Sequence, residues 1–489
     1  MSEAKGLSPD IFDVAIVGSG FGGLCMAIAL QREGIDNFII LEKDEDFGGT
    51  WRVNDYPGAA CDVASHLYSF SFFQNPEWTR RFPPRDEIWE YTRSVVHHFR
   101  LAPKIRLSTE LEGAEYDEAT GLWTLATSRG IMRARIVVLA VGALSRPAFP
   151  AIAGLDRFKG TVFHSARWNH AYDLTGKRVA VIGTGASAIQ FVPEIAGKVA
   201  RLDLYQRTPP WILPRRDRAI TRPERWLLRH VKALQWLYRG WQYLQWEWRY
   251  IGFSSMPWLI RAMQAMALRH LRRQIPDDAE LRRKLTPDYA LGCKRVLLTN
   301  DYYPALTRPN VELLTCGIEA IGEDGITGRD GVVRPVDAII FGTGFDVAES
   351  WTGFDIRGRG GVSLAETGKD GLEAYKGCAV AGFPNLYLII GPNTALGHNS
   401  IIYMIESSVR YVMGAIRAMR GKGLASLEVK RAAQTRYNAA IQERLKGTVW
   451  NSGCKSWYLA GNGKNYTLWP GFTFQYRRIT REFDLANYD

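Results

Sequence analysis

Several large protein classes are excluded by what this sequence lacks. Its six cysteines are scattered without a CxxC pair, which excludes a thioredoxin-reductase-like dithiol relay and offers no zinc-binding spacing. The longest apolar runs, such as IVVLAVG and LYLIIG, have the length of a buried strand and not of a membrane span. The opening MSEAKGLSPDIF shows no basic region followed by an apolar stretch, so no secretory signal is visible. These absences favour a protein of the reducing cytoplasm that holds no metal.

The charge balance is basic, but it comes without a nucleic-acid-binding motif. The chain has a formal net charge of +12 at pH 7 over 489 residues. No recognised nucleic-acid module accompanies this charge, so we expect no nucleic-acid partner. Attraction of polyanionic cofactors and general solubility explain the excess of Lys and Arg. An apolar fraction of 46% is ordinary for a globular protein of two or three domains.

Two dinucleotide-binding fingerprints are present in the same register. The first, VAIVGSGFGG, is a hydrophobic strand that runs into Gly18, Gly20 and Gly23, and Glu42 follows Gly18 by 24 residues. Such glycines let backbone amides at a helix N-terminus approach a pyrophosphate. Glu42 closes the next strand and can accept hydrogen bonds from a ribose 2'-hydroxyl. This unit predicts an FAD site.

The second fingerprint differs from the first at the position that contacts the adenosine ribose. VAVIGTGASA repeats the pattern with Gly183, Gly185 and Ala188, and Arg207 follows Gly183 by 24 residues. An arginine at this position attracts a 2'-phosphate, which only NADPH carries. A single GxGxxG pattern is weak evidence, whereas two in one register with opposite charges indicate a flavin that NADPH reduces.

The order of these signals predicts an α/β fold with two Rossmann-like domains, the NADPH domain being inserted into the FAD domain. Strand, glycine turn, helix and acid-ended strand occupy residues 12 to 43, and IVVLAVGALSRP marks an exit from the first domain. The buried strand in VDAIIFGTGFD closes the second unit. We therefore assign residues 1–147 to the first part of the FAD domain, 148–335 to the NADPH domain with a helical insertion at about 215–290, and 336–489 to the part that completes the FAD domain.

Two longer motifs resemble the type I Baeyer-Villiger monooxygenases. Residues 48–62, GGTWRVNDYPGAACD, match [AG]GxWxxxx[FY]P[GM]xxxD, and residues 158–168, FKGTVFHSARW, match FxGxxxHxxxW. The resemblance covers nearly the whole chain. It departs from the family at Asn169, where Pro or Asp usually follows the tryptophan. Related enzymes that oxidise nitrogen and sulfur tend to have another aromatic in place of Trp168, so Trp168 favours the Baeyer-Villiger branch.

The resemblance implies roles for individual residues. Gly49, Thr50, Trp51 and Asp62 belong to the first motif and are expected beside the FAD. The stretch LGCKRVLLTNDYYPAL resembles the family segment that supplies a catalytic cation, and the matching residue is Arg295, which Asp62 would orient. Arginine suits this role because it stays charged when buried. Taken without the resemblance, Arg295 reads as a surface salt-bridge partner and Asp62 as a loop-capping residue.

Further residues are expected at the nicotinamide cofactor. Lys294 matches a residue that helps Arg207 and Thr208 to hold the 2'-phosphate. Trp457, in CKSWYLAGN, matches a tryptophan that contacts the nicotinamide ribose, although an ordinary core aromatic is an equal alternative. His164 and Trp168 are interpreted as packing residues of a hinge between the domains.

The function that the resemblance implies is NADPH- and O2-dependent conversion of a ketone to an ester or lactone, through a flavin C4a-peroxide and a tetrahedral adduct. A fixed cation in a water-poor pocket would stabilise the negative charge that develops on oxygen. Two alternatives stay open. One is oxygenation of sulfur or amine nitrogen by the same flavin species, and the other is a flavoprotein that oxidises NADPH without an organic substrate.

A basic, aromatic helical stretch lies within the second unit, from about Glu224 to Arg273. Its apolar residues fall at spacings of three and four and form one stripe: Leu227, Val231, Leu234, Tyr238, Trp241, Leu244 and Trp248. Basic residues lie away from the stripe: Arg225, Arg229, Lys232 and Arg239. Such a helix can make peripheral contact with a membrane surface. The favoured interpretation is a lid whose stripe packs on the NADPH domain beside the substrate entrance.

Overall fold

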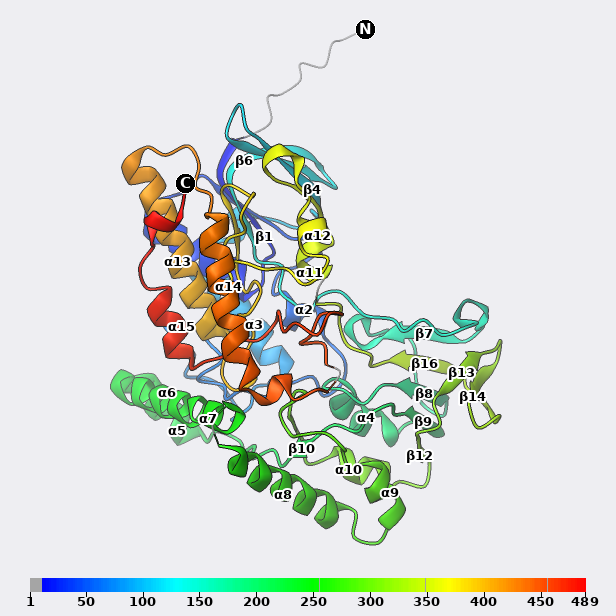
Figure 1. Ribbon diagram of the computed structural model, residues 1–489. Helices are drawn as coiled ribbons and strands as arrows, with labels where there is room; N and C mark the ends of the chain where they lie inside the picture. The colour runs from blue at the N-terminus through cyan, green and yellow to red at the C-terminus, as the bar shows by residue number, and fades with distance from the viewer. Residues whose placement is uncertain (1–10, 255, 348, 455) are drawn as a thin grey trace.

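The computed structural model describes residues 11–254, 256–347, 349–454 and 456–489. The N-terminal segment inspected for a secretory signal therefore lies largely outside the described residues. Figure 1 shows two parts joined side by side, one built around β1, β4 and β6 and the other around β7, β8, β9 and β16. Each part is a sheet flanked by helices, as the two strand-turn-helix patterns in the sequence predict.

The first part is an eight-stranded sheet in the order β17-β4-β5-β6-β1-β2-β3, with β18 paired to β6. The pairs β6-β1, β1-β2 and β6-β18 are parallel, and β4, β5 and β6 form an antiparallel meander. The strands are β1 Ile11–Val17, β2 Phe38–Leu41, β3 Ile105–Arg106, β4 Leu111–Asp117, β5 Leu122–Thr127, β6 Gly130–Leu139, β17 Asp355–Arg357 and β18 Leu386–Leu388.

Helices from both ends of the chain cover this sheet. Helix α1 (Phe21–Arg32) follows β1 and packs against α13 (Ile401–Lys422), so residues almost 400 apart in the sequence share one core. Most residues of α1 are buried, which explains the apolar run after the glycine turn. The remaining helices of this part are α2 Thr50–Val53, α3 Arg85–His98, α11 Glu349–Thr352, α12 Leu364–Thr367, α14 Arg431–Lys446 and α15 Thr473–Ile479.

The second part is a five-stranded parallel sheet in the order β12-β9-β8-β16-β7. Its strands are β7 Thr161–His164, β8 Arg178–Ile182, β9 Arg201–Tyr205, β12 Val311–Leu314 and β16 Ala338–Phe341, and its helices include α4 Ala188–Ala196 and α10 Tyr302–Leu306. Short strands β13 Ile318–Ile321, β14 Gly325–Gly328 and β15 Val333–Pro335 form a separate antiparallel sheet, and β10 Ile212–Leu213 pairs with β11 Leu297–Leu298. The predicted fold class, two Rossmann-like units in an α/β protein, is confirmed.

The returning chain supplies β17 and β18 to the first sheet, after β16 has joined the second. The division at 147/148 and 335/336 stays a prediction. The pairing of β16 places the last strand of the second sheet just beyond residue 335, because the strand in VDAIIFG is held between β7 and β8.

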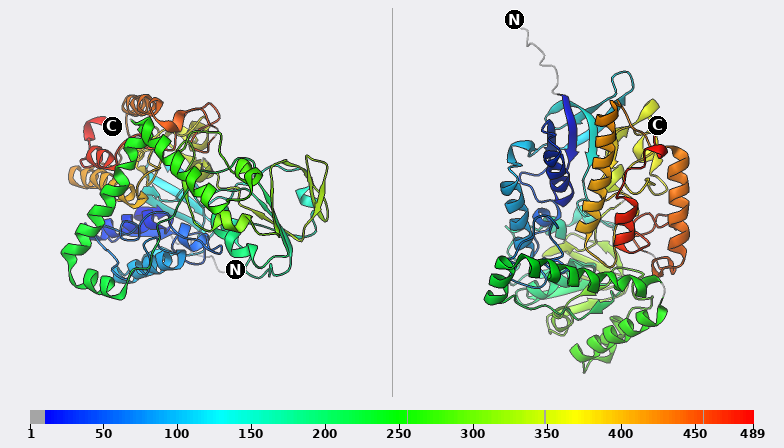
Figure 2. Two further views of the ribbon diagram at one scale, coloured as in Figure 1. Left: turned by 90° about the horizontal axis from the view of Figure 1, so that it is seen from below. Right: turned by 90° about the vertical axis from the view of Figure 1, so that its left-hand side faces the viewer.

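The helical insertion crosses the lower end of the molecule. It consists of α5 Arg222–His230, α6 Lys232–Glu247, α7 Arg249–Ser254, α8 Pro257–Gln274 and α9 Ala279–Lys284. These green helices lie at the lower end in the right view of Figure 2, and in the left view, which looks from below, they lie toward the viewer. Within the described ranges, no helix is both long and apolar enough to cross a bilayer.

The favoured orientation of this insertion is wrong for its first helices. Trp241, Leu244 and Trp248 of the predicted stripe are exposed. The buried face of α6 instead carries Gln235, Arg239, Gln242, Trp246 and Glu247. It packs partly on the first domain, because the Nη1 atom of Arg239 donates to the carbonyl oxygen of His66. Periodicity defined a helix with two unlike faces, but it did not determine which face points inward.

Candidate active site

The first glycine turn brings α1 close to the end of β1. Gly18 has φ +101°, and a Cβ there would lie 2.6 Å from the carbonyl oxygen of Ala140 at the end of β6. A Cβ on Gly23 would collide with the carbonyl oxygen of Gly18. Only glycine fits both places, so the turn keeps the backbone amides at the start of α1 accessible, as pyrophosphate binding requires.

The motif GGTW meets this turn directly. A Cβ on Gly49, which has φ +57°, would lie 2.9 Å from the Cα of Gly20. Helix α2 begins at Thr50, and the indole nitrogen of Trp51 donates to the hydroxyl of Tyr68 at 3.0 Å. Two segments predicted separately to contact FAD therefore form one glycine-lined cradle that a larger side chain would fill. These features fit an FAD dinucleotide.

Glu42 lies at the end of β2 and is buried. One carboxylate oxygen accepts from the backbone amide of Ser19 at 3.0 Å and also from the Ser19 hydroxyl. The other accepts from the amide of Asp44 at 3.1 Å. Hydrogen bonds thus connect the glycine turn to Glu42, the residue predicted to contact the FAD ribose. The donor residue, Ser19, was not identified from the sequence.

The second glycine turn repeats the first in the other sheet. Gly183 has φ +107°, and a Cβ there would lie 2.5 Å from the carbonyl oxygen of Gly342 at the end of β16. Ala188 is fully buried at the start of α4, where Gly342 passes close to it. Gly185 is more open, since a Cβ would come no nearer than 3.9 Å to that oxygen. The close packing of this turn fits a second dinucleotide.

A basic cluster lies where a 2'-phosphate is predicted. Arg207 is exposed just beyond β9, and the carbonyl oxygen of Thr208 accepts from the hydroxyl of Thr184 in the glycine turn at 3.3 Å. Desolvation lowers the pKa of Lys294, and the positive charge of Arg207 lowers it further. Two cations that repel each other at a nucleotide turn are well placed to share one phosphate. The structure therefore brings Arg207 and Lys294 together.

The predicted catalytic pair is in direct contact. The Nη2 of Arg295 lies 2.6 Å from one Asp62 carboxylate oxygen, and its Nε lies 3.0 Å from the same oxygen. The Asp62 charge raises the pKa of Arg295 above its already high ordinary value. Asp62 thus favours the charged form of the guanidinium and orients it. The two residues are 233 apart in the sequence, and only the fold joins them.

The segment after α14 also approaches this pair. Tyr458 is buried near Arg295 and Asp62, and burial raises the pKa of its hydroxyl to about 12. The adjacent Trp457 is 41% exposed, which disfavours the alternative of an ordinary core aromatic. In Figure 1 this orange-red segment lies at the junction of the two parts.

A disulfide that the sequence analysis did not anticipate holds that segment in place. Cys293 and Cys454 are bonded across 161 residues of sequence, with Cα atoms 6.3 Å apart. Cys293 immediately precedes Lys294, and Cys454 is three residues before Trp457. The covalent link therefore joins the cationic segment to the tryptophan loop. Such a distant pairing has no local signal.

The helical insertion contributes a further cation. Arg249, at the start of α7, has its pKa lowered to about 10 by desolvation, and the Asp62 carboxylate partly offsets this effect. Its guanidinium also lies 3.7 Å from the ring centre of Trp246. The start of α7 thus comes near the Arg295–Asp62 pair.

The first motif also makes a contact between the two domains that the sequence analysis missed. The Tyr56 hydroxyl donates to the side-chain oxygen of Gln190 on α4 at 2.9 Å, and the Gln190 amide donates to the carbonyl oxygen of Ala60 at 3.0 Å. Gly58 approaches α4 so closely that a Cβ would lie 2.8 Å from the Gln190 carbonyl oxygen. The Tyr-Pro-Gly part of the motif therefore serves domain docking.

His164 and Trp168 are packed as the hinge interpretation predicts. Burial lowers the pKa of His164 to about 4, so its ring is neutral at pH 7, and the ring accepts from the amide of Ala166 at 3.1 Å. Trp168 packs edge-on against Phe163 and also contacts Phe191. It also borders a hollow of about 390 Å³ that reaches Asp55 and Trp89 of the first domain. Their role at a hinge stays a prediction.

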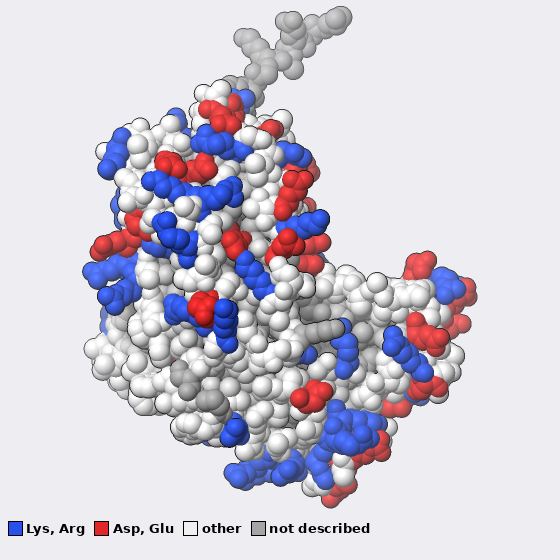
Figure 3. Space-filling model, in the orientation of Figure 1, with Lys and Arg blue, Asp and Glu red and all other residues white. Residues whose placement is uncertain are grey.

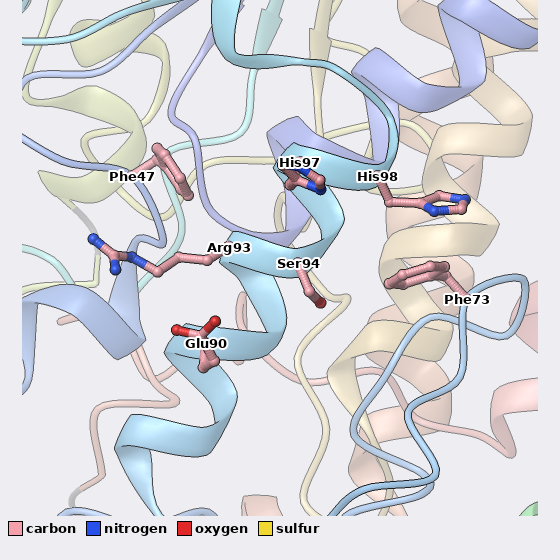
Figure 4. A pocket seen from close by; sticks show the side chains of 7 residues that line it. All are labelled: Phe47, Phe73, Glu90, Arg93, Ser94, His97 and His98. Atoms are coloured by element: carbon pink, nitrogen blue, oxygen red, sulfur yellow. The ribbon is translucent and has the colours of Figure 1, made fainter. Parts of the chain in front are cut away.

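A larger hollow, of about 630 Å³, lies elsewhere along α3 (Figure 4). It is lined by Phe47, Phe73, Glu90, Arg93, Ser94, His97 and His98. None of these seven residues is a predicted site residue, so we assign this hollow no role in the proposed chemistry.

The two glycine cradles, the opposite charges at their ribose positions and the Arg295–Asp62 pair define a flavoprotein of the class that uses two dinucleotides. The chain matches the family Pyridine nucleotide-disulphide oxidoreductase over residues 15–228. It is 53% identical to a Baeyer-Villiger monooxygenase of Pseudomonas aeruginosa, with 97% of this chain and 90% of that protein covered. The chain belongs to the Baeyer-Villiger monooxygenases, as its two long motifs predict.

Solved structures agree with this assignment. A closed crystal structure of cyclohexanone monooxygenase matches with a TM-score of 0.88 and 27% identity, covering 97% of each chain. A crystal structure of OTEMO in complex with FAD and NADP matches with a TM-score of 0.86 and 25% identity, also covering 97% of each chain. The predicted cofactors, FAD and NADPH, and the class of NADPH-dependent flavin monooxygenase are confirmed.

Proposed function

We infer that this protein inserts one oxygen atom of O2 beside the carbonyl of a small-molecule ketone, giving an ester or a lactone at the expense of NADPH. The observation that carries this inference is the Arg295 guanidinium, held by Asp62 at 2.6 Å in a chain of this family. FAD, reduced by NADPH, supplies the oxygen-transfer chemistry when it is bound.

Arg295 would provide the electrostatic part of the reaction. Negative charge develops on oxygen as the carbonyl is attacked, and a positioned cation stabilises that charge most where water is displaced. The Arg295 side chain is 38% exposed. Two of its five N–H groups, one on Nε and one on Nη2, donate to Asp62, so three remain available to other acceptors. The pair therefore presents a fixed, charged donor to the substrate.

The remaining predicted residues would bind and orient the cofactors. The FAD cradle would consist of Gly18, Gly20, Gly23, Glu42, Gly49, Thr50, Trp51 and Asp62. The NADPH site would consist of Gly183, Gly185, Ala188, Arg207, Thr208, Lys294 and Trp457. The support for both sets is their clustering: the Gly20–Gly49 approach, the Ser19–Glu42 bonds and the Arg207–Lys294 repulsion each link residues that the sequence separates.

Product analysis separates this function from the alternatives. The holoenzyme is incubated with NADPH, O2 and a panel of cyclic, aromatic and long-chain linear ketones, in parallel with a thioether and a tertiary amine. Ester or lactone formed in proportion to NADPH consumed supports the proposal. Sulfoxide or N-oxide as the sole organic product, or hydrogen peroxide alone with every compound, would contradict it.

The cytoplasmic location expected from the sequence stays a prediction. Disulfides persist mainly in oxidising compartments, so the Cys293–Cys454 bond is the feature of the structure that speaks against it. Cell fractionation tests the location, and counting free thiols at these two cysteines tests whether the disulfide is present in the cell. Peripheral contact with a membrane is the other partner expected from the sequence, and the surface of the helical insertion supports it.

A further inference from the structure

Helix α6 is amphipathic in the opposite sense to an ordinary surface helix. Its buried residues Gln235, Arg239, Gln242 and Trp246 are spaced by four, three and four, which places them on one face. Three of these four side chains are polar. The first domain binds the one charged side chain among them, since Arg239 donates to the carbonyl oxygen of His66 and to the hydroxyl of Ser69.

The outer face of α6 is apolar. Leu237, Trp241, Leu244 and Trp248 repeat the same spacing two residues further on, about 200° around the helix. Leu237 is 70% exposed, Trp241 60% and Trp248 66%. More large apolar side chains are exposed on α5, on α6 and at the residue between them: Trp226, Leu227, Val231 and Trp236. We call these eight residues the outer apolar face. Monomeric proteins rarely expose so many large apolar side chains on neighbouring elements without a partner.

The charges that accompany this face are almost all positive. Residues 222–274 contain ten Lys and Arg and two Asp and Glu. Both acids are engaged: Glu224 pairs with Arg218 at 2.8 Å, and buried Glu247 accepts from Asn399 and Thr473. In Figure 3 the surface over α6 and α7 is largely uncharged, and basic side chains gather along the lower edge of the molecule, with acidic side chains beside them at its right-hand end. Exposed basic residues of α8 include Arg261, Arg269, Arg272 and Arg273.

This combination selects one kind of partner. Tryptophan favours the boundary between water and lipid, where its ring is buried and its N–H stays hydrated. Lys and Arg beside such rings are attracted to anionic headgroups. A second copy docked on a two-fold axis would instead place the same basic side chains against each other, which costs Coulomb energy.

We propose that the outer apolar face of α5 and α6 docks peripherally on an anionic lipid bilayer, with its tryptophans at the headgroup level and the basic residues of the insertion facing anionic lipids. No part of the chain crosses the bilayer in this arrangement. The polar inner face keeps the helices attached to the first domain, so docking requires no unfolding of the insertion.

Vesicle flotation of the FAD-loaded enzyme tests this proposal without any turnover. The probes are vesicles of phosphatidylcholine alone and of phosphatidylcholine mixed with phosphatidylglycerol. The test variant is Trp241→Ser/Trp248→Ser, and the matched control is Ile131→Ser, since Ile131 is 65% exposed on β6, outside the insertion. Flavin content and circular dichroism verify that each variant is folded.

We expect the wild type and Ile131→Ser to float with the anionic vesicles, more weakly at high salt, and the double variant to bind at least about tenfold less tightly. Absence of wild-type binding to anionic vesicles, or equal binding by the double variant, would overturn the proposal. So would sedimentation showing a wild-type dimer that the double variant abolishes, because the face would then be covered by a second copy. Ketone oxygenation in vesicle-free buffer reports separately on the proposed function.

Discussion

Glu42 and Arg207 occupy corresponding positions in two similar folding units, and their opposite charges are the basis on which we predict which unit binds which cofactor. Each follows the first glycine of its turn by 24 residues and ends or follows the second strand of its unit. Because strand and turn geometry repeat, the local sequence sufficed to predict both positions. What surrounds the two residues differs: Glu42 is buried and bonded to Ser19, whereas Arg207 is exposed beside Lys294.

Replacing Arg207 by Ala should weaken use of NADPH and leave use of NADH nearly unchanged. Only NADPH offers a phosphate to this charge, and a charge-assisted bond is worth about 1.5 to 3 kcal/mol. We expect kcat/KM for NADPH to fall roughly ten- to a hundredfold. Steady-state kinetics with both cofactors measure this, and Arg135→Ala, an exposed arginine of the first domain, serves as the control. An equal loss with both cofactors would rule out the assignment.

Replacing Glu42 by Gln should impair FAD retention and not nicotinamide preference. The carboxylate holds two donors of Ser19 and is expected to accept from the FAD ribose, and an amide cannot accept at both ends. The purified variant should contain less flavin per chain, as measured by absorbance, while Glu443→Gln on the exposed surface should not. Full flavin occupancy together with altered nicotinamide preference would reverse our allocation of the two fingerprints.

Two residues near the proposed site, Ser19 and Tyr458, could not be predicted from their local sequence. Ser19 lies inside the glycine fingerprint at a position that the pattern leaves unspecified, and Tyr458 stands beside Trp457 without a motif of its own. Their importance comes from contacts across long stretches of chain. Tyr458 approaches Arg295 only because the segment after α14 returns to the junction of the two domains.

At the scale of elements, the disulfide between Cys293 and Cys454 joins two segments that are predicted to contact the nicotinamide cofactor. One is the Lys294–Arg295 segment, and the other is the loop that carries Trp457. A link of this kind reduces the conformational freedom that the loop must lose when it contacts a cofactor.

Replacing Cys454 by Ser should therefore raise the KM for NADPH. We expect an increase of about tenfold, which corresponds to the entropy cost of fixing the backbone of one more residue when the cofactor binds. FAD content should not change, because the glycine cradle of the first domain is distant in sequence and makes its own contacts. The control is Cys316→Ser, whose thiol is free in the structure. Treatment with a dithiol reductant should reproduce the effect in the wild type. An unchanged KM in both experiments would show that the bond does not position the loop.

Helix α6 was predicted from the sequence pattern, but the face that it buries was not. Spacings of three and four predicted a helix with an apolar stripe, and the helix is there. Whether the stripe faces the core depends on what the rest of the protein offers the other face. Here the first domain offers His66, Ser69, Asn399 and Thr473 as polar partners, and the polar side of α6 is the one that is buried.

At the scale of the whole molecule, the two nucleotide-binding units were predictable because each is encoded locally, by a strand, a glycine turn and a helix. The return of the chain was predicted in outline only. Strands β17 and β18 are three residues each, too short for a clear pattern, and they join the first sheet by pairing with β4 and β6. The docking of the two units, through Tyr56 and Gln190, likewise depends on residues 134 apart.

The central claim is that Arg295, oriented by Asp62, makes this flavoprotein oxygenate a carbonyl. The most direct measurement is the yield of ester and of hydrogen peroxide per NADPH consumed, for the wild type, Arg295→Ala, Asp62→Ala and the surface control Arg135→Ala. We predict that Arg295→Ala still consumes NADPH but loses about 10²- to 10³-fold in the rate of ester formation and releases mostly peroxide, because one electrostatic stabiliser is removed. Asp62→Ala should show a milder form of the same shift, since it leaves the arginine in place without its partner. Ester formation by Arg295→Ala at the wild-type rate and yield would contradict the account.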